Sequence, residues 1–173
     1  MEPFDPFAVL GLPRQYDLDA AAVQRAYLER SAQVHPDVSG ADDDEDDRAS
    51  ELNRAKQILD DPEQRAIALW KLLGGGGVGA VDKTLPPGFL MQMMEVREEV
   101  EAAARMEGPG GKEARRKWEA WAEDRRREYQ GRVGALFARA ETHSPPAADP
   151  ILLKQIKTEL NAWRYIERLI EQL

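Results

Sequence analysis

The stretch Val34-His35-Pro36-Asp37-Val38 divides the first half of the chain into two helical segments. Proline disfavours helical geometry in the residue before it, so the segment that Asp19 can cap ends at His35 and a loop begins there. The apolar residues of the two segments recur at roughly helical spacing: Val23, Ala26, Tyr27 and Val34 before the loop, and Leu52, Ala55, Ile58 and Leu59 after an acidic run at 42–47. The pattern predicts two antiparallel helices that bracket a His-Pro-Asp loop.

Two shorter helices are predicted on either side of this pair. Asp5 can cap a helix with Pro6 at its first position and Gly11 just past its end, which gathers Phe7, Val9 and Leu10 into an apolar patch. Asp61-Pro62 starts another helix in the same way, with Ala66, Leu69, Trp70 and Leu73 as its apolar residues.

Composition favours an all-α fold. The 173 residues include 24 basic and 32 acidic side chains, a net charge of −8, and no cysteine. Without cysteine, the chain has no disulfide, no thiolate zinc site, no cysteine-held iron–sulfur cluster and no cysteine nucleophile. Threonine occurs only at positions 84, 142 and 158, while alanine, glutamate and arginine fill the long stretches, a mixture that favours helices over strands.

Glycine and proline runs divide the chain further. Four successive glycines at 74–77 end a helix, and Pro86-Pro87-Gly88 opens the next one. The runs at 108–111 and 144–146 separate two more helices, so the second half is predicted to hold three. We therefore expect a first domain at 1–76, a glycine- and proline-rich connection at 77–88, and a three-helix bundle at 89–173.

The first half resembles a J-domain, the module that stimulates ATP hydrolysis by DnaK-type chaperones. The resemblance is carried by three matches in order: His35-Pro36-Asp37 after Arg25-Ala26-Tyr27, then Leu52-Asn53-Arg54-Ala55, then Asp61-Pro62-Glu63-Gln64-Arg65-Ala66. It covers most of residues 4–73. A His-Pro-Asp tripeptide alone is a weak signal, but this ordered helical context makes it a strong one.

Two further stretches narrow the resemblance to the HscB type of J-protein, over nearly the whole chain. They are Phe7-Ala8-Val9-Leu10-Gly11-Leu12-Pro13 and the run from Phe89 to Glu99. The resemblance implies a J-domain joined to a C-terminal three-helix bundle, and no catalytic site. It also implies two partners, a DnaK-like ATPase of the HscA type and the iron–sulfur scaffold IscU.

The resemblance assigns the first partner, the chaperone, to His35, Pro36 and Asp37, together with Arg25, Tyr27 and Arg30. Pro36 holds His35 in extended geometry, and the Asp37 carboxylate is suited to a charge-assisted hydrogen bond with an arginine of the partner. A basic face on the helix before the tripeptide is usual in the family. Here only Arg25 and Arg30 are basic on that helix, which predicts weaker electrostatic steering.

The second partner, the scaffold, is assigned to the bundle. Phe89, Met93, Val96, Val100 and Ala103 recur at spacings of four and three, a stripe that faces a core and leaves Met91 and Met94 on the opposite side. In the last helix, Leu152, Ile156, Leu160, Trp163, Ile166 and Ile170 form a stripe of their own, with Tyr165 nearly opposite Trp163. By resemblance, the scaffold-binding residues are Leu90, Met91, Met94, Glu95, Glu98 and Tyr165.

Two other functions stay open at this point. The basic residues at 112–127, interleaved with Trp118 and Trp121, are compatible with nucleic-acid binding, although acidic residues neutralise the same segment. Within the J-protein class, the bundle could instead hold unfolded clients. The acidic run at 42–47 lacks the spacing of a calcium loop, so we expect no metal site there. We expect no cofactor either. No segment is typical of a signal peptide or a membrane span, so we expect a cytoplasmic protein. The net charge of −8 gives no broad attraction to phosphate backbones or anionic lipids, so we favour a monomer with neither a nucleic-acid nor a membrane partner.

Overall fold

The computed structural model describes residues 4–33, 43–76, 83–141 and 149–171. Over these residues the chain forms seven helices and no strand, which confirms the all-α prediction. The helices are α1 (Pro6–Leu10), α2 (Ala20–Gln33), α3 (Asp43–Asp60), α4 (Pro62–Leu72), α5 (Phe89–Arg105), α6 (Gly108–Glu141) and α7 (Pro150–Ile170). They belong to two compact units, one made of 1–77 with 137–148 and the other of 78–136 with 149–173.

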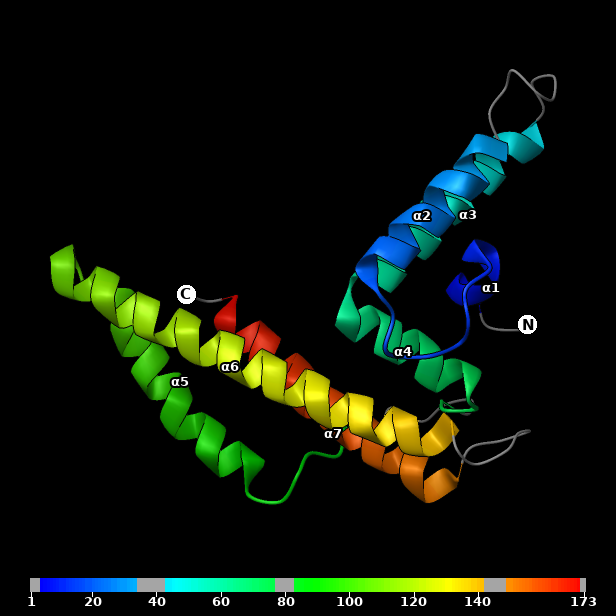
Figure 1. The fold of residues 1–173 in the computed structure, drawn as a ribbon. Helices are drawn as coiled ribbons and strands as arrows, with labels where there is room; N and C mark the ends of the chain where they lie inside the picture. The colour runs from blue at the N-terminus through cyan, green and yellow to red at the C-terminus, as the bar shows by residue number, and fades with distance from the viewer. Residues whose placement is uncertain (1–3, 34–42, 77–82, 142–148, 172–173) are drawn as a thin grey trace. The chain divides into compact units, whose positions relative to one another are not determined.

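Helices α2 and α3 of the first unit lie side by side and antiparallel (Figure 1). Helices α1 and α4 and the end of α6 also belong to this unit. Of the predicted apolar residues in its first four helices, those only partly buried are Val9, Ala26, Tyr27, Ile58, Trp70 and Leu73. Those buried are Phe7, Leu10, Val23, Leu52, Ala55, Leu59, Ala66 and Leu69. Burying each of the larger of these side chains stabilises the fold by about 1.5–3 kcal/mol, which holds the four short helices together.

Helix ends in the first unit follow the predicted capping residues. The Asp5 carboxylate accepts hydrogen bonds from the backbone N–H groups of Phe7 and Ala8, at 3.0 and 3.1 Å, and so satisfies donors that the first turn of a helix leaves unpaired. Asp61 caps α4 in the same way. Gly11 ends α1 with φ +70°, a left-handed conformation that glycine adopts without strain.

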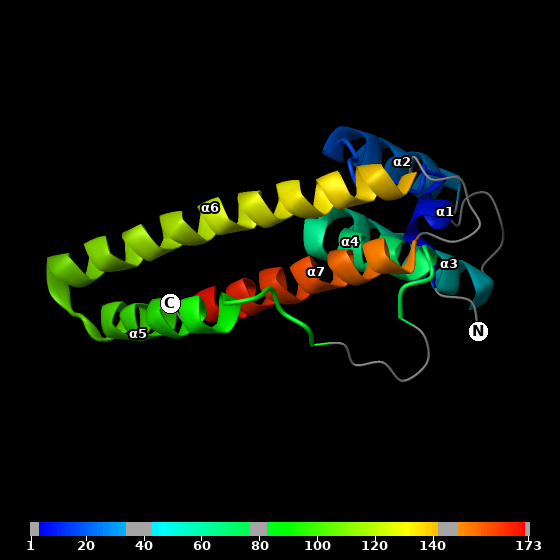
Figure 2. The ribbon, with the colours of Figure 1, turned by 90° about the horizontal axis from the view of Figure 1, so that it is seen from below.

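The second unit consists of α5, most of α6 and α7, which lie side by side (Figure 2). Its buried residues include most of the two predicted stripes, namely Phe89, Met93, Val100 and Ala103 of α5 and Leu152, Ile156, Leu160, Trp163 and Ile166 of α7. From α6, Trp118, Ala122, Tyr129 and Val133 join them. The prediction of a three-helix arrangement is therefore confirmed.

One predicted boundary is wrong in detail. The run at 108–111 does not separate two helices; it forms the first turn of α6, which begins at Gly108, and residues 106–107 separate it from the end of α5 at Arg105. Pro109 is tolerated there because the first turn of a helix has unpaired N–H groups in any case. Gly111 is required by close packing, since a Cβ atom at this position would lie 2.2 Å from the carbonyl oxygen of Met106.

Candidate partner-binding surfaces

The chaperone-facing surface predicted from the sequence is only partly described by the structure. His35, Pro36 and Asp37 lie outside the described residues. Their flanks are described: α2 ends at Gln33 and α3 begins at Asp43, on the two helices that the sequence places on either side of the tripeptide.

Tyr27 is held by the neighbouring helix. Its hydroxyl donates a hydrogen bond to the side-chain oxygen of Asn53 at 2.7 Å, and the ammonium group of Lys56 lies 5.7 Å from the centre of its ring. Both partners belong to α3, and the tyrosine side chain is half-buried. In this arrangement Tyr27 fixes α2 against α3, and its hydroxyl is already engaged.

Arg25 and Arg30 are both exposed on α2 but do not form one stripe. Five residues in an α-helix correspond to a rotation of about 140° beyond one full turn, so the two side chains leave the helix in different directions. Arg30 lies against the end of α1, because a Cβ atom added to Gly11 would come within 2.4 Å of its Nη2 atom. The two cations therefore present separate contact points to a partner.

Leu28 is an exposed apolar residue that sequence reasoning did not single out. Its side chain is 55% exposed, and it follows Arg25 by three residues, which places both on one side of α2. The sequence could have indicated its exposure, because Leu28 falls outside the stripe of apolar residues predicted to be buried on this helix. An apolar side chain beside a cation on an exposed helix face is a typical element of a protein-binding surface.

The predicted scaffold-binding surface is open on α5. Leu90, Met91 and Met94 are 54%, 74% and 63% exposed, whereas Phe89 and Met93 of the same helix are buried. Large apolar side chains are costly to leave in contact with water, and unbranched thioethers adapt readily to the shape of a partner. Glu95 and Glu98 are exposed on the same helix and add negative charge beside the methionines.

Tyr165 is less exposed than the helical pattern alone predicts. Its side chain is half-buried, and its ring packs edge-on against the buried ring of Phe89, with 5.5 Å between the ring centres and an interplanar angle of 85°. This geometry is favourable for aromatic pairs and joins α7 to the first turn of α5. Tyr165 therefore reaches the α5 end that carries Leu90 and Met91, and Phe89 is the residue that positions it.

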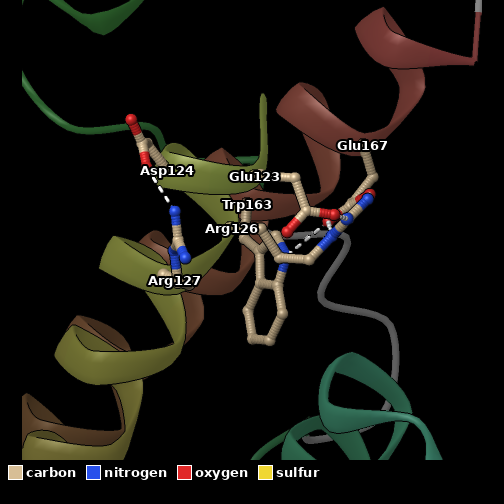
Figure 3. Close-up of polar contacts among 6 residues, drawn as sticks. All are labelled: Glu123, Asp124, Arg126, Arg127, Trp163 and Glu167. Carbon is tan, nitrogen blue, oxygen red and sulfur yellow. Dashed lines mark hydrogen bonds and ion pairs between the residues drawn. The ribbon is translucent and has the colours of Figure 1, made fainter. Parts of the chain in front are cut away.

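A partly buried ion pair holds α7 against α6 in the same unit (Figure 3). The Arg126 guanidinium donates two hydrogen bonds of 2.7 Å to the two carboxylate oxygens of Glu167, and the indole N–H of Trp163 donates to the same carboxylate at 2.9 Å. These hydrogen bonds hold the pKa of Glu167 below its ordinary value. Trp163 and Glu167 both belong to α7, so the two hydrogen bonds from Arg126 are the ones that join α7 to α6.

The nucleic-acid interpretation of α6 is not favoured by the positions of its aromatic and basic side chains. Trp118 is 7% exposed and packs with Val100 and Ala103, so its ring is not available for stacking on a base. Arg127 is paired with Asp124 at 2.5 Å. Within the described ranges there is no group of three or more histidine, cysteine or acidic residues able to hold a metal ion. None of the described helices is long and apolar enough to cross a membrane.

The comparisons with known proteins match both halves of the chain. Residues 5–68 match the DnaJ domain family, and residues 85–173 match the family described as the HSCB C-terminal oligomerisation domain. The second match alone spans more than half of the chain. The chain belongs to the HscB family. The first matched region contains α1, α2, α3 and the start of α4, and the second contains α5, α6 and α7.

Curated relatives in the HscB family bear the name co-chaperone protein HscB homolog. The relative from Paraburkholderia phymatum is 45% identical over 104 residues, which are 57% of this chain and 59% of that protein. The relative from Burkholderia thailandensis is 33% identical over 174 residues and is matched over 94% of both chains. The alignment thus spans little more than half the length of the Paraburkholderia phymatum protein and nearly all of the Burkholderia thailandensis protein.

Solved HscB structures share the fold. The chaperone HscB from Vibrio cholerae matches with a TM-score of 0.73 and 23% identity, over 96% of this chain and 93% of that one. The human co-chaperone protein HscB matches with a TM-score of 0.74 and 23% identity, over 96% of this chain and 79% of the human chain. At this level of identity the likeness concerns the fold alone.

Proposed function

We propose that this HscB-family chain is a co-chaperone, and not an enzyme, in iron–sulfur cluster assembly. It binds an IscU-type scaffold protein, delivers it to an ATPase chaperone of the DnaK/HscA type, and stimulates that chaperone's ATPase. Family membership supports the proposal for both halves of the chain. The observation that carries it is the exposure of Met91 and Met94 on the face of α5 that points away from the core.

The scaffold site of this proposal is the set Leu90, Met91, Met94, Glu95, Glu98 and Tyr165. Its apolar centre supplies the area that a partner removes from water, and its two glutamates favour a partner with a basic rim. The position one turn beyond Glu98, which is often acidic in the family, is Ala102 in this chain. The proposed acidic rim is therefore shorter than in the family pattern.

The chaperone site is the set His35, Pro36, Asp37, Arg25, Tyr27 and Arg30, of which the tripeptide acts as the trigger. The hydrolysed nucleotide is bound by the chaperone, so this chain acts only through its different affinities for the chaperone's conformations. Holding the scaffold on the same polypeptide raises the scaffold's effective concentration at the chaperone. Substrate capture and nucleotide turnover then coincide, and the chain needs no cofactor.

We place the protein in the cytoplasm, as expected for a relative of the bacterial HscB homologues. The monomer favoured by the sequence and the oligomerisation named in the matched C-terminal family predict different molecular masses in solution. Light scattering on the full chain distinguishes these two states.

Asp37→Asn tests the proposal directly. Removing the negative charge while keeping the size of the side chain is expected to reduce stimulation of the chaperone ATPase to the basal rate, because the charge-assisted hydrogen bond is lost. Steady-state ATP hydrolysis with and without the variant measures this effect. Scaffold affinity, measured by calorimetry, is expected to stay unchanged and serves as the control for folding. Full stimulation by Asp37→Asn would show that the tripeptide is not the trigger.

A further inference from the structure

A groove of about 270 Å³ opens on the second unit, between α5 and α6 and beside Pro86 and Pro87. Its volume lies just below the range of about 300–1,000 Å³ typical of small-molecule pockets, so it admits one ring system with a short substituent and no folded segment. Met93 and Val96 of α5 contribute apolar surface to its lining. Leu90, Met91 and Met94 do not line it, so it is distinct from the proposed scaffold site.

Hydrogen-bond donors outnumber acceptors in the lining. Arg125 and Arg132 both line the groove, and Glu128 is the one acid among its lining residues. Arg125 binds one carboxylate oxygen of Glu128 through Nη1 at 2.6 Å, and Arg132 binds the other. A guanidinium carries five N–H donors, so Arg125 keeps donors in excess of this pairing, whereas Arg132 also pairs with Glu159 at 3.5 Å. The Nε atom of Arg125 is buried and has no hydrogen-bond partner among the described residues.

Two aromatic side chains add further donors beside the apolar surface. Tyr129 and Trp121 line the groove, where the phenol hydroxyl and the indole N–H are both hydrogen-bond donors. Burial raises the pKa of Tyr129 above its ordinary value, so the hydroxyl is protonated and able to donate at neutral pH. A ligand that satisfies these groups must supply acceptor atoms.

We propose that this groove binds an aromatic carboxylate. The ring of the ligand packs against Met93, Val96 and Trp121, and its carboxylate accepts hydrogen bonds from Arg125 and Tyr129, which bring positive charge and donors to one place. A free aromatic acid and the aromatic C-terminal residue of another polypeptide present the same chemistry. The inference does not depend on the proposed co-chaperone function, because neither set of partner-binding residues lines the groove.

Calorimetry of the full chain with N-acetyltryptophan and with N-acetyltryptophanamide tests this proposal, because the two probes differ only in the carboxylate. We expect the acid to bind at least roughly tenfold more tightly than the amide, the factor expected for a charge-assisted hydrogen bond. In NMR spectra the indole N–H signal of Trp121 should shift on binding. Equal affinities, no saturable binding at millimolar acid, or an unshifted Trp121 signal would overturn the proposal.

Arg125→Gln and Arg127→Gln form a matched pair for the same measurement. Both arginines pair with an acid three residues away on α6, but only Arg125 lines the groove. Arg125→Gln is expected to weaken binding of the acid roughly tenfold, and Arg127→Gln to leave it unchanged. Equal effects of the two substitutions would contradict the assignment. Indole-3-acetate and the peptide Gly-Gly-Trp then distinguish the two sources of the ligand. Tighter binding of indole-3-acetate indicates a free aromatic acid, and tighter binding of Gly-Gly-Trp indicates the C-terminal residue of a polypeptide.

Discussion

On α5, the residues that pack into the core differ from the residues proposed to bind a partner. The helical spacing of Phe89 and Met93 predicted correctly that these residues are buried, and the same spacing predicted that Met91 and Met94 are not. The partial burial of Tyr165 was not predictable in this way, because it depends on the ring of Phe89, which is 76 positions away in the sequence. Local periodicity determines which side of a helix a residue occupies, whereas contacts between helices determine how much of it stays exposed.

Tyr16 provides a test of burial at the residue scale. Desolvation by burial raises its pKa to about 12 from an ordinary value of 10.0, against the opposing effect of the Arg65 guanidinium near its ring. The folded state therefore favours the neutral phenol. This contribution to the free energy of unfolding is fully present below pH 10 and is lost as the pH rises from about 10 through about 12.

Urea unfolding between pH 8 and pH 12, together with ultraviolet titration of the tyrosines, measures the effect of Tyr16. Tyr16→Phe is expected to remove part of the loss of stability at alkaline pH, because phenylalanine does not ionise. A titration in which every tyrosine ionises near pH 10 would contradict the burial of this side chain.

Helix ends were predictable where one residue determines them. Asp5, Asp61 and Gly11 act through contacts with their own neighbours in the chain, so the sequence alone located three ends of α1 and α4. The start of α6 was predicted wrongly because glycine and proline usually interrupt helices. Gly111 packs so closely against the backbone of Met106 that a larger residue would not fit there. This requirement for glycine is visible only in three dimensions.

Glu167→Gln tests how α7 is held against α6. The substitution keeps the shape of the side chain but removes the charge that accepts hydrogen bonds from Arg126 and Trp163, so we expect the free energy of unfolding to fall by about 1–3 kcal/mol. Urea unfolding monitored by circular dichroism measures this change. Asp124→Asn is the control, since its pair with Arg127 is exposed and contributes at most about 1 kcal/mol. Equal effects of the two substitutions would contradict the role of Glu167.

If the exposed residues of α5 bind the scaffold, replacing them should weaken scaffold binding. The combined substitutions Met91→Ala, Met94→Ala and Tyr165→Ala are expected to weaken scaffold affinity by roughly tenfold or more. A few residues that become buried at the centre of an interface on binding carry most of its binding energy. Calorimetry with the scaffold measures the affinity. Met91→Ala with Met94→Ala alone keeps the Phe89–Tyr165 contact and should account for a large part of the loss.

Ile151→Ala is the matched control for the α5 substitutions, because Ile151 is an exposed apolar residue of α7 outside the proposed site. It is expected to leave scaffold affinity unchanged. A triple variant that binds the scaffold as tightly as the natural chain would remove the assignment of this surface.

Charge is distributed unequally over the whole molecule. Residues 1–77 carry 8 basic and 16 acidic side chains, whereas residues 78–173 carry 16 of each, so the first half holds the entire net charge of −8. The sequence was sufficient for this distribution, for the number of helices in each half and for the family resemblance. The division of α6 between the two units was not predictable, because nothing in the sequence interrupts that helix near Phe137.

We propose that one chain couples a scaffold to the nucleotide cycle of a chaperone through two separate surfaces. Steady-state ATP hydrolysis by the chaperone, measured with this chain, with the scaffold and with both together, reveals this coupling. We predict that the two together stimulate hydrolysis by more than the sum of their separate effects, and that Met91→Ala with Met94→Ala removes only this excess. Purely additive stimulation by the natural chain and the scaffold would show that the two surfaces are not coupled.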